Sequence, residues 1–120
     1  MAVTAGTPTV IINNFNVFEA IVPLTASGSY PGTSAGDTLS LIGIVPSNSV
    51  PIFVTIDEEP PEGTLASGLL FRFAPGTTQA NGAMQVFQSG SSGQANLGNV
   101  TYASVAVANL VARVVYKKFV

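Results

Sequence analysis

Two strand-like runs joined by a turn decide the fold class of this chain. Residues 68–88 read GLLFRFAPGTTQANGAMQVFQ. Large apolar side chains alternate with other residues in both runs, which is the period-two pattern of a half-buried β-strand. The alternating positions are Leu69, Phe71 and Phe73 in the first run and Met84 and Val86 in the second. Between the runs, Asn81-Gly82 is a pair that two-residue type I′ turns favour, because both residues tolerate positive φ. The stretch therefore predicts a β-hairpin with a type I′ turn at Asn81-Gly82.

Outward from this hairpin, glycine and proline divide the chain into similar short pieces. The 12 Gly and 8 Pro residues separate segments rich in Val, Ile, Thr and Phe. No segment before Gly98 keeps a helical spacing of apolar residues over about ten positions. We expect further strands over residues 9–12, 15–24, 38–44, 52–56 and 110–117. We expect a turn over residues 57–63, and residues 104–109 fit either a strand or one helical turn.

The expected architecture is all-β: a single-domain β-sandwich or jelly-roll-like barrel of about seven to eight short antiparallel strands. A chain of 120 residues buries about two-thirds of its surface on folding, which is enough for one core and too little for two. We therefore expect residues 1–120 to form one β-sandwich domain. Residues 1–14 would be an N-terminal arm or an edge strand of that domain.

The chain carries unusually little charge. Four basic and six acidic residues make up 8% of the sequence, whereas a typical soluble domain has about 25% charged residues. A monomer with so few charges has little protection against association. The composition therefore predicts a homo-oligomer, or a poorly soluble isolated chain, whose surface is largely covered by other protein.

Missing residue types argue against several function classes. The sequence contains no His, Cys or Trp, which removes the usual general base at neutral pH, thiolate chemistry and nearly all transition-metal sites. Four cations give no footprint for nucleic acid, and no run of about 18 apolar residues predicts a membrane helix. No basic segment precedes an apolar stretch at the N-terminus, so a secretory signal is not expected. We expect a protein that is not an enzyme and that uses no cofactor or metal.

The acidic residues gather in one segment, at Asp57, Glu58, Glu59 and Glu62. Closely spaced carboxylates can hold Ca²⁺, but the segment lacks an EF-hand pattern of oxygen ligands. A pair of carboxylates for glycoside cleavage is weaker still, because one short turn cannot flank a sugar on both sides. The favoured interpretation is a solvated turn that discourages pairing of sheet edges.

Three of the four cations lie near the C-terminus, at Arg113, Lys117 and Lys118. Together with the acidic segment they are the candidate inter-subunit contacts, with the basic strand of one copy meeting the acidic turn of another. The alternative is a C-terminal strand whose charges keep it soluble and protect a sheet edge, and this alternative is favoured.

Three segments resemble a known family. Residues 36–41 read GDTLSL, residues 73–87 read FAPGTTQANGAMQVF, and residues 114–119 read VVYKKF. In this order they resemble the head decoration, or cement, proteins of tailed bacteriophages. The resemblance covers roughly residues 25–120. The acidic segment and the strands before Phe18 are not part of the pattern.

The resemblance implies a β-sandwich without catalytic residues that binds the outside of a capsid and stabilises contacts between major capsid protein subunits. The implied partners are the major capsid protein and further copies of the chain, as a homodimer or homotrimer. The implied location is the virion, assembled in the bacterial cytoplasm. The alternative is a carbohydrate-binding β-sandwich of a phage head or tail fibre. Sugar sites usually present exposed aromatic side chains, and Tyr30, Tyr102 and Tyr116 are dispersed in a sequence without Trp.

Overall fold

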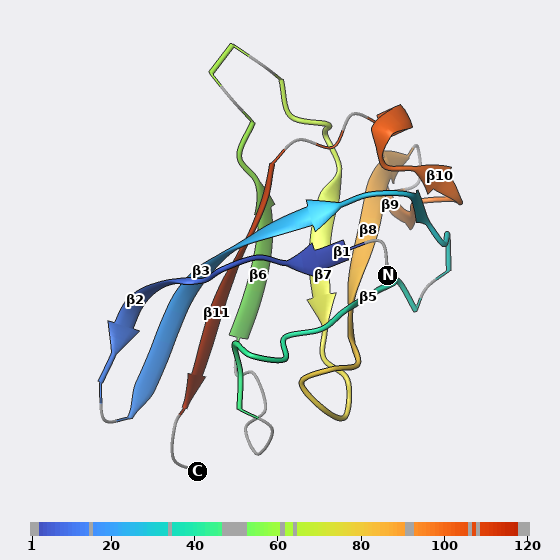
Figure 1. Ribbon diagram of the computed structural model, residues 1–120. Helices are drawn as coiled ribbons and strands as arrows, with labels where there is room; N and C mark the ends of the chain where they lie inside the picture. Colours follow the sequence, from blue (N-terminus) through green and yellow to red (C-terminus); the bar gives the residue numbers. More distant parts are fainter. Residues whose placement is uncertain are drawn as a thin grey trace.

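The chain folds as an all-β half-barrel (Figure 1). The computed structural model describes residues 3–14, 16–33, 35–46, 53–60, 62–63, 65–90, 93–105, 107 and 109–117. The strands are β1 (Val3–Ala5), β2 (Thr9–Asn13), β3 (Val17–Ala26), β4 (Ser29–Tyr30), β5 (Asp37–Leu39), β6 (Phe53–Glu58), β7 (Leu70–Ala74), β8 (Gly82–Gly90), β9 (Gly93–Asn96), β10 (Val100–Thr101) and β11 (Leu110–Lys117). Within these ranges the helical content is one 3₁₀ turn, η1 (Ala103–Val105). The expected all-β class with antiparallel strands is confirmed.

One antiparallel sheet forms most of the molecule, with the order β1-β3-β11-β6-β7-β8-β5. Strand β2 also pairs with β3, strand β9 also pairs with β8, and β4 pairs with β10 in a small separate sheet. The end strands β1 and β5 approach each other, so the sheet curls into a half-barrel around its concave side. Strand β11 lies between β3 and β6 and joins the N-terminal strands to the rest of the sheet.

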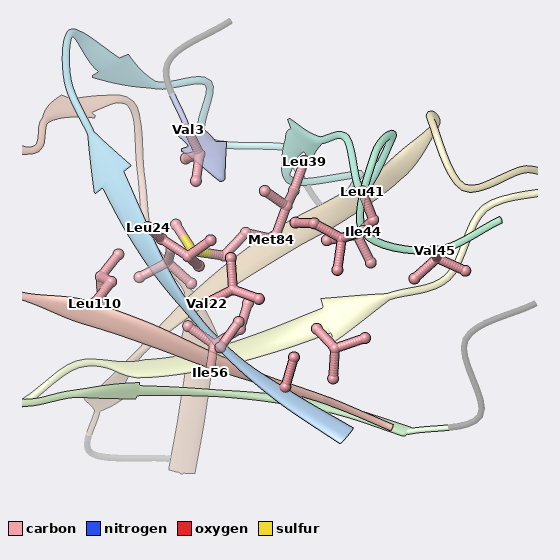
Figure 2. Close-up of a cluster of buried hydrophobic side chains, with 14 of the residues drawn as sticks. Val3, Val22, Leu24, Leu39, Leu41, Ile44, Val45, Ile56, Met84 and Leu110 are labelled. Atoms are coloured by element: carbon pink, nitrogen blue, oxygen red, sulfur yellow. The ribbon is translucent and has the colours of Figure 1, made fainter. Parts of the chain in front are cut away.

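The core fills the concave side of this sheet. In β11, alternate residues are buried, namely Leu110, Ala112, Val114 and Tyr116, as their spacing predicts. Strand β3 supplies Val22 and Leu24, and β8 supplies Met84 and Val86. Figure 2 shows side chains from these strands converging with those of the segment that follows β5, which are Leu41, Ile44 and Val45.

The predicted hairpin is present, but its turn differs from the expectation. Strands β7 and β8 pair antiparallel, with Phe73 opposite Met84, which confirms the hairpin. The type I′ turn is wrong, because Gly82 does not adopt positive φ and is instead the first residue of β8. A Cβ on Gly82 would lie 2.5 Å from Cζ of Phe73. Glycine is therefore needed here for space beside a phenyl ring rather than for turn geometry.

The hairpin loop, residues 75–81, is closed by the side chain of Asn81. Its Oδ1 accepts a hydrogen bond from the backbone N–H of Thr78 at 2.9 Å, and its Nδ2 donates to Oγ1 of Thr77 at 2.8 Å. A Cβ on Gly76 would lie 2.4 Å from the carbonyl oxygen of Asn81. The loop is thus a compact structure of its own, held by one side chain.

Two other expected elements end elsewhere. The strand expected over residues 38–44 stops at Leu39, and the backbone N–H groups of Ile44 and Val45 both donate to the carbonyl of Leu41 at 3.0 Å. The turn expected over residues 57–63 starts later, because β6 continues through Glu58. In both places the strand ends where its backbone hydrogen bonds change partner, and not where the local composition predicts.

The N-terminal residues lie along one side of β3. Strand β2 pairs with its first half and β1 with its second half. Pro23 falls between these two pairings, and its carbonyl accepts a hydrogen bond from the N–H of Gly6 at 2.8 Å. Proline has no backbone N–H to donate. Pro23 therefore lies in the gap between β2 and β1, where pairing along this edge of β3 is interrupted.

Candidate interaction surface

The acidic residues lie at the end of β6 and just beyond it. Asp57, Glu59 and Glu62 are exposed, and Glu58 is half-buried. The carboxylate of Glu58 accepts hydrogen bonds from Ser67, at 2.5 Å from Oγ and 3.2 Å from the backbone N. Glu58 therefore fixes the segment that leads into β7. In the ranges that the structure describes, no group of three or more acidic side chains is placed to hold a metal ion.

Two shallow depressions open on the surface. One, of about 330 Å³, lies between the end of β6 and the segment before β7, and it is lined by residues that include Asp57, Glu58 and Leu69. The other, of about 410 Å³, lies beside the turn after β5 and is lined by Gln79, Tyr116 and their neighbours.

Arg113 forms an ion pair with Glu19 across the centre of the sheet. Its Nε donates to Oε2 of Glu19 at 3.1 Å, and its Nη2 donates to Oε1 at 3.0 Å. The Glu19 side chain is 11% exposed and the Arg113 side chain 52% exposed. Hydrogen bonding to Glu19, and the negative charge of that residue, raise the pKa of Arg113 above its ordinary value. The arginine that we considered for an inter-subunit contact therefore has a partner within its own chain.

Sequence reasoning missed Glu19 as a partner of Arg113. The alternation in β3 places Glu19 on the side of the sheet away from Phe18, but the pairing of β3 with β11 is not readable from either strand. In that pairing Glu19 lies opposite Val115 and Arg113 lies opposite Ile21, so the ion pair is diagonal. Of the other two basic candidates, Lys117 ends β11 opposite Val17, and Lys118 lies outside the described residues.

Apolar side chains surround this ion pair on the outer side of the sheet. The pairing of β3, β11 and β6 places one set of residues on the side away from the core. We name the apolar members of this set the outer apolar face: Val17 and Ile21 of β3, Val111 and Val115 of β11, and Phe53 of β6. The same side of the sheet also carries Glu19, Arg113, Thr55 and Asp57. Phe53 is 52% exposed. Glu19 and Arg113 neutralise each other at the centre of this face, and the exposed Asp57 lies at its edge, opposite Val111. The five apolar residues between these charges form a surface of the kind that protein partners cover.

The three tyrosines are buried and serve the core. The Tyr30 hydroxyl donates to Oδ1 of Asn96 at 2.8 Å, and the Tyr102 hydroxyl donates to Oδ2 of Asp37 at 2.7 Å. Burial, together with the hydrogen bond and charge of Asp37, raises the pKa of Tyr102 far above its ordinary value. Burial also raises the pKa of Tyr116, whose ring lies 5.0 Å from that of Phe18. None of the three is exposed as a platform for a sugar ring.

No family model, curated protein or solved structure matches this chain. Among the described residues, no helix has the length and apolar character to span a membrane.

Proposed function

We propose that this chain is a head decoration, or cement, protein of a tailed bacteriophage: a virion structural protein without enzymatic activity that binds the outside of the capsid. The outer apolar face is the observation that carries the proposal, because a monomer in water gains nothing from it. The order of the segments 36–41, 73–87 and 114–119, which resembles that family, supports the same function. In this role the chain stabilises contacts between neighbouring major capsid protein subunits.

The outer apolar face suits this role because it is built on the most extensively paired part of the sheet. Strand β11 pairs with β3 from Leu110 to Lys117 and with β6 from Leu110 to Val115, so the side chains of the face are held in place before binding. A standard interface of about 1,600 Å², slightly more than half of it apolar, gives about 22 kcal/mol of gross stabilisation at 25 cal/mol per Å². Association costs about 4–15 kcal/mol. A contact that reaches this standard size can therefore bridge two capsid subunits without help from ion pairs.

A carbohydrate-binding module is the alternative function, and the exposed aromatic residues decide against it. Phe53 is the exposed aromatic side chain among the described residues, and the charged groups near it, Glu19 and Arg113, bind each other. Sugar recognition needs polar groups that converge beside an aromatic ring. We therefore retain the decoration protein as the proposed function.

The proposal is tested by binding purified protein to expanded, undecorated heads of the phage that encodes it. We expect hundreds of copies per head, and a density on the outside of the capsid lattice in an electron-microscopy map. The variant Phe53→Asp places a charge in the outer apolar face and should weaken binding by about tenfold or more. The matched control is Leu65→Asp, because Leu65 is 90% exposed and lies away from the sheet.

The control variant should bind heads as the unmodified protein does, and circular dichroism should show the same strand content in all three proteins. Equal binding by Phe53→Asp and the unmodified protein would place the capsid contact elsewhere. A few copies at the tail, in place of hundreds on the head, would favour the fibre module instead.

A further inference from the structure

Strand β2 is an exposed edge whose apolar side chains are not covered by the core. It pairs with β3 through one edge, and in the described part of the chain no strand pairs with its other edge. Every residue of β2 is exposed, including Val10 at 49%, Ile11 at 54% and Ile12 at 39%. Figure 1 shows β2 projecting beside the first half of β3, away from β5 and the closed side of the half-barrel. The strand therefore presents to the solvent an edge that pairs with no described strand, together with three β-branched side chains.

Proteins usually protect such edges with charge, proline, bulges or short length. Strand β2 has a bulge between Val10 and Ile12, but residues 3–18 contain no Asp, Glu, Lys or Arg. The edge strand β5 has three residues, begins with Asp37 and lies close to β1. Strand β2 is longer and carries no charge, and its protection against pairing is limited to the bulge and to Pro8 just before the strand.

We propose that two copies of this chain associate through β2, which pairs antiparallel with β2 of the second copy and makes one sheet continuous across both molecules. A partner strand can pair with the outer backbone edge of residues 9–12, which a partner packed on one face of the sheet would not do. A second copy fits because a two-fold axis brings identical edges together, and edges without charge do not repel each other. Cross-strand pairs of Val and Ile are also among those that stabilise antiparallel strands.

The contact is short, so the dimer is weak. Five residues in antiparallel geometry span about 17 Å, which by itself gives less than a standard interface of about 800 Å² per partner. Val17 and Ile21 of β3 lie next to β2 on the sheet and extend the contact. The rest of the outer apolar face remains accessible in the dimer, because pairing uses the edge of the sheet. The inference is thus independent of the proposed function, and a dimer can form whether or not the chain binds capsids.

Disulfide crosslinking tests this interface directly, because the chain contains no cysteine. Single variants Val10→Cys, Ile11→Cys and Ile12→Cys are oxidised under mild conditions and analysed on non-reducing gels. Only residues near the two-fold axis bring their Cβ atoms within about 4.5 Å of each other. We expect a disulfide-linked dimer with a maximum at one of these positions. The matched control, Thr38→Cys on the edge strand β5, should give no disulfide-linked dimer.

Sedimentation of the unmodified chain at increasing concentration gives a second, independent measurement. We expect a reversible monomer–dimer equilibrium with a dissociation constant on the order of micromolar. The variant Val10→Lys should weaken association at least about tenfold, whereas Thr38→Lys should leave it unchanged. Circular dichroism checks that both variants fold.

Four outcomes would overturn the inference: a chain that stays monomeric at every concentration, a closed trimer, crosslinking at Thr38→Cys equal to that on β2, or association that Val10→Lys leaves intact. A monomeric chain that nevertheless binds heads would leave the decoration function standing and remove the dimer. A chain that dimerises through β2 but does not bind heads would leave the dimer standing and remove the decoration function.

Discussion

Individual polar side chains in this molecule connect strands that are far apart in the sequence. Arg113 of β11 holds Glu19 of β3, and Tyr102 holds Asp37 of β5. The backbone N–H of Val86 donates to the Tyr30 hydroxyl at 3.1 Å, which ties the small β4–β10 sheet to β8. Each contact satisfies a polar group that would otherwise be costly to bury. The direction in which Glu19 and Arg113 point could be predicted from the alternation in their strands, but their contact could not, because it depends on which strands pair.

At the residue scale, we predict that stability falls above pH 10 and that Tyr102 accounts for much of the fall. The pKa of Tyr102 is raised above its ordinary value of 10.0 by burial first and by Asp37 second. The unfolded chain therefore loses this proton at a lower pH than the folded chain. The stabilisation is fully present below pH 10 and is lost as the pH rises further, with a slope of at most about 1.4 kcal/mol per pH unit for one group.

Urea unfolding of the unmodified chain and of Tyr102→Phe between neutral and alkaline pH measures this effect. The variant should lose about 0.5–1.5 kcal/mol at neutral pH with its hydrogen bond, and its stability should decline less steeply above pH 10. Tyr116→Phe is the comparison, because burial alone raises the pKa of Tyr116. Parallel curves for all three proteins would contradict the prediction.

At the scale of elements, strands were more predictable than the connections between them. Alternation was sufficient for β7, β8 and β11, because each has one face against the core. It failed after Leu39, where Leu41 and Ile44 look like a continuing strand but are buried by a turn. Asn81-Gly82 was misleading in the same way. The pair is typical of a two-residue type I′ turn, but here it lies at the end of a longer loop. The space beside Phe73 that requires Gly82 depends on packing, which no local pattern contains.

A substitution in the loop between β7 and β8 distinguishes a type I′ turn at Asn81-Gly82 from the longer loop that the Asn81 side chain closes. In a type I′ turn, Asn81→Gly would be nearly neutral, because glycine adopts positive φ readily. Here the substitution removes both hydrogen bonds of the Asn81 side chain, and we expect a loss of about 1–2 kcal/mol in the free energy of unfolding. Thermal or urea unfolding measures it. Asn99→Gly, in the exposed bend before β10, adds the same backbone freedom and should have the smaller effect. An unchanged midpoint for Asn81→Gly would show that the loop does not depend on this side chain.

At the scale of the whole molecule, the low charge content predicted a surface that other protein covers. The fold shows where the exposed apolar residues of that surface lie. Ten charged residues were too few to identify a face, and the charge clusters drew attention to Glu62 and Lys118 instead. The strand order β3-β11-β6 brings Val17, Val115 and Phe53 together, and that order joins segments from the two ends of the chain. Because no local pattern determines which strands become neighbours, the outer apolar face could not be predicted from the sequence.

Attachment through this face should resist salt. The two charges at its centre, Glu19 and Arg113, are already paired with each other, so screening within about 3 Å at 1 M NaCl removes little of the binding energy. Guanidinium weakens apolar contacts and solvates peptide groups, and it should release the protein at concentrations below those that disrupt the capsid. Decorated particles washed in either solution and then pelleted provide the measurement. Release by NaCl together with retention in guanidinium would mean that the Asp57–Glu62 segment and the basic end of β11 dominate attachment.

The central place of β11 also affects how the chain is made. The strands that precede it form two partial sheets, residues 3–26 and residues 53–90, which have no hydrogen-bonded strand in common until Leu110–Lys117 lies between them. A ribosome that adds about 5–20 residues per second needs about 5–20 s to pass from β3 to the end of β11. Throughout that interval the nascent chain carries unpaired apolar strands close to those of neighbouring chains on the same messenger. Synthesis rate and chaperone supply should therefore limit the yield of this protein more than the stability of its finished fold.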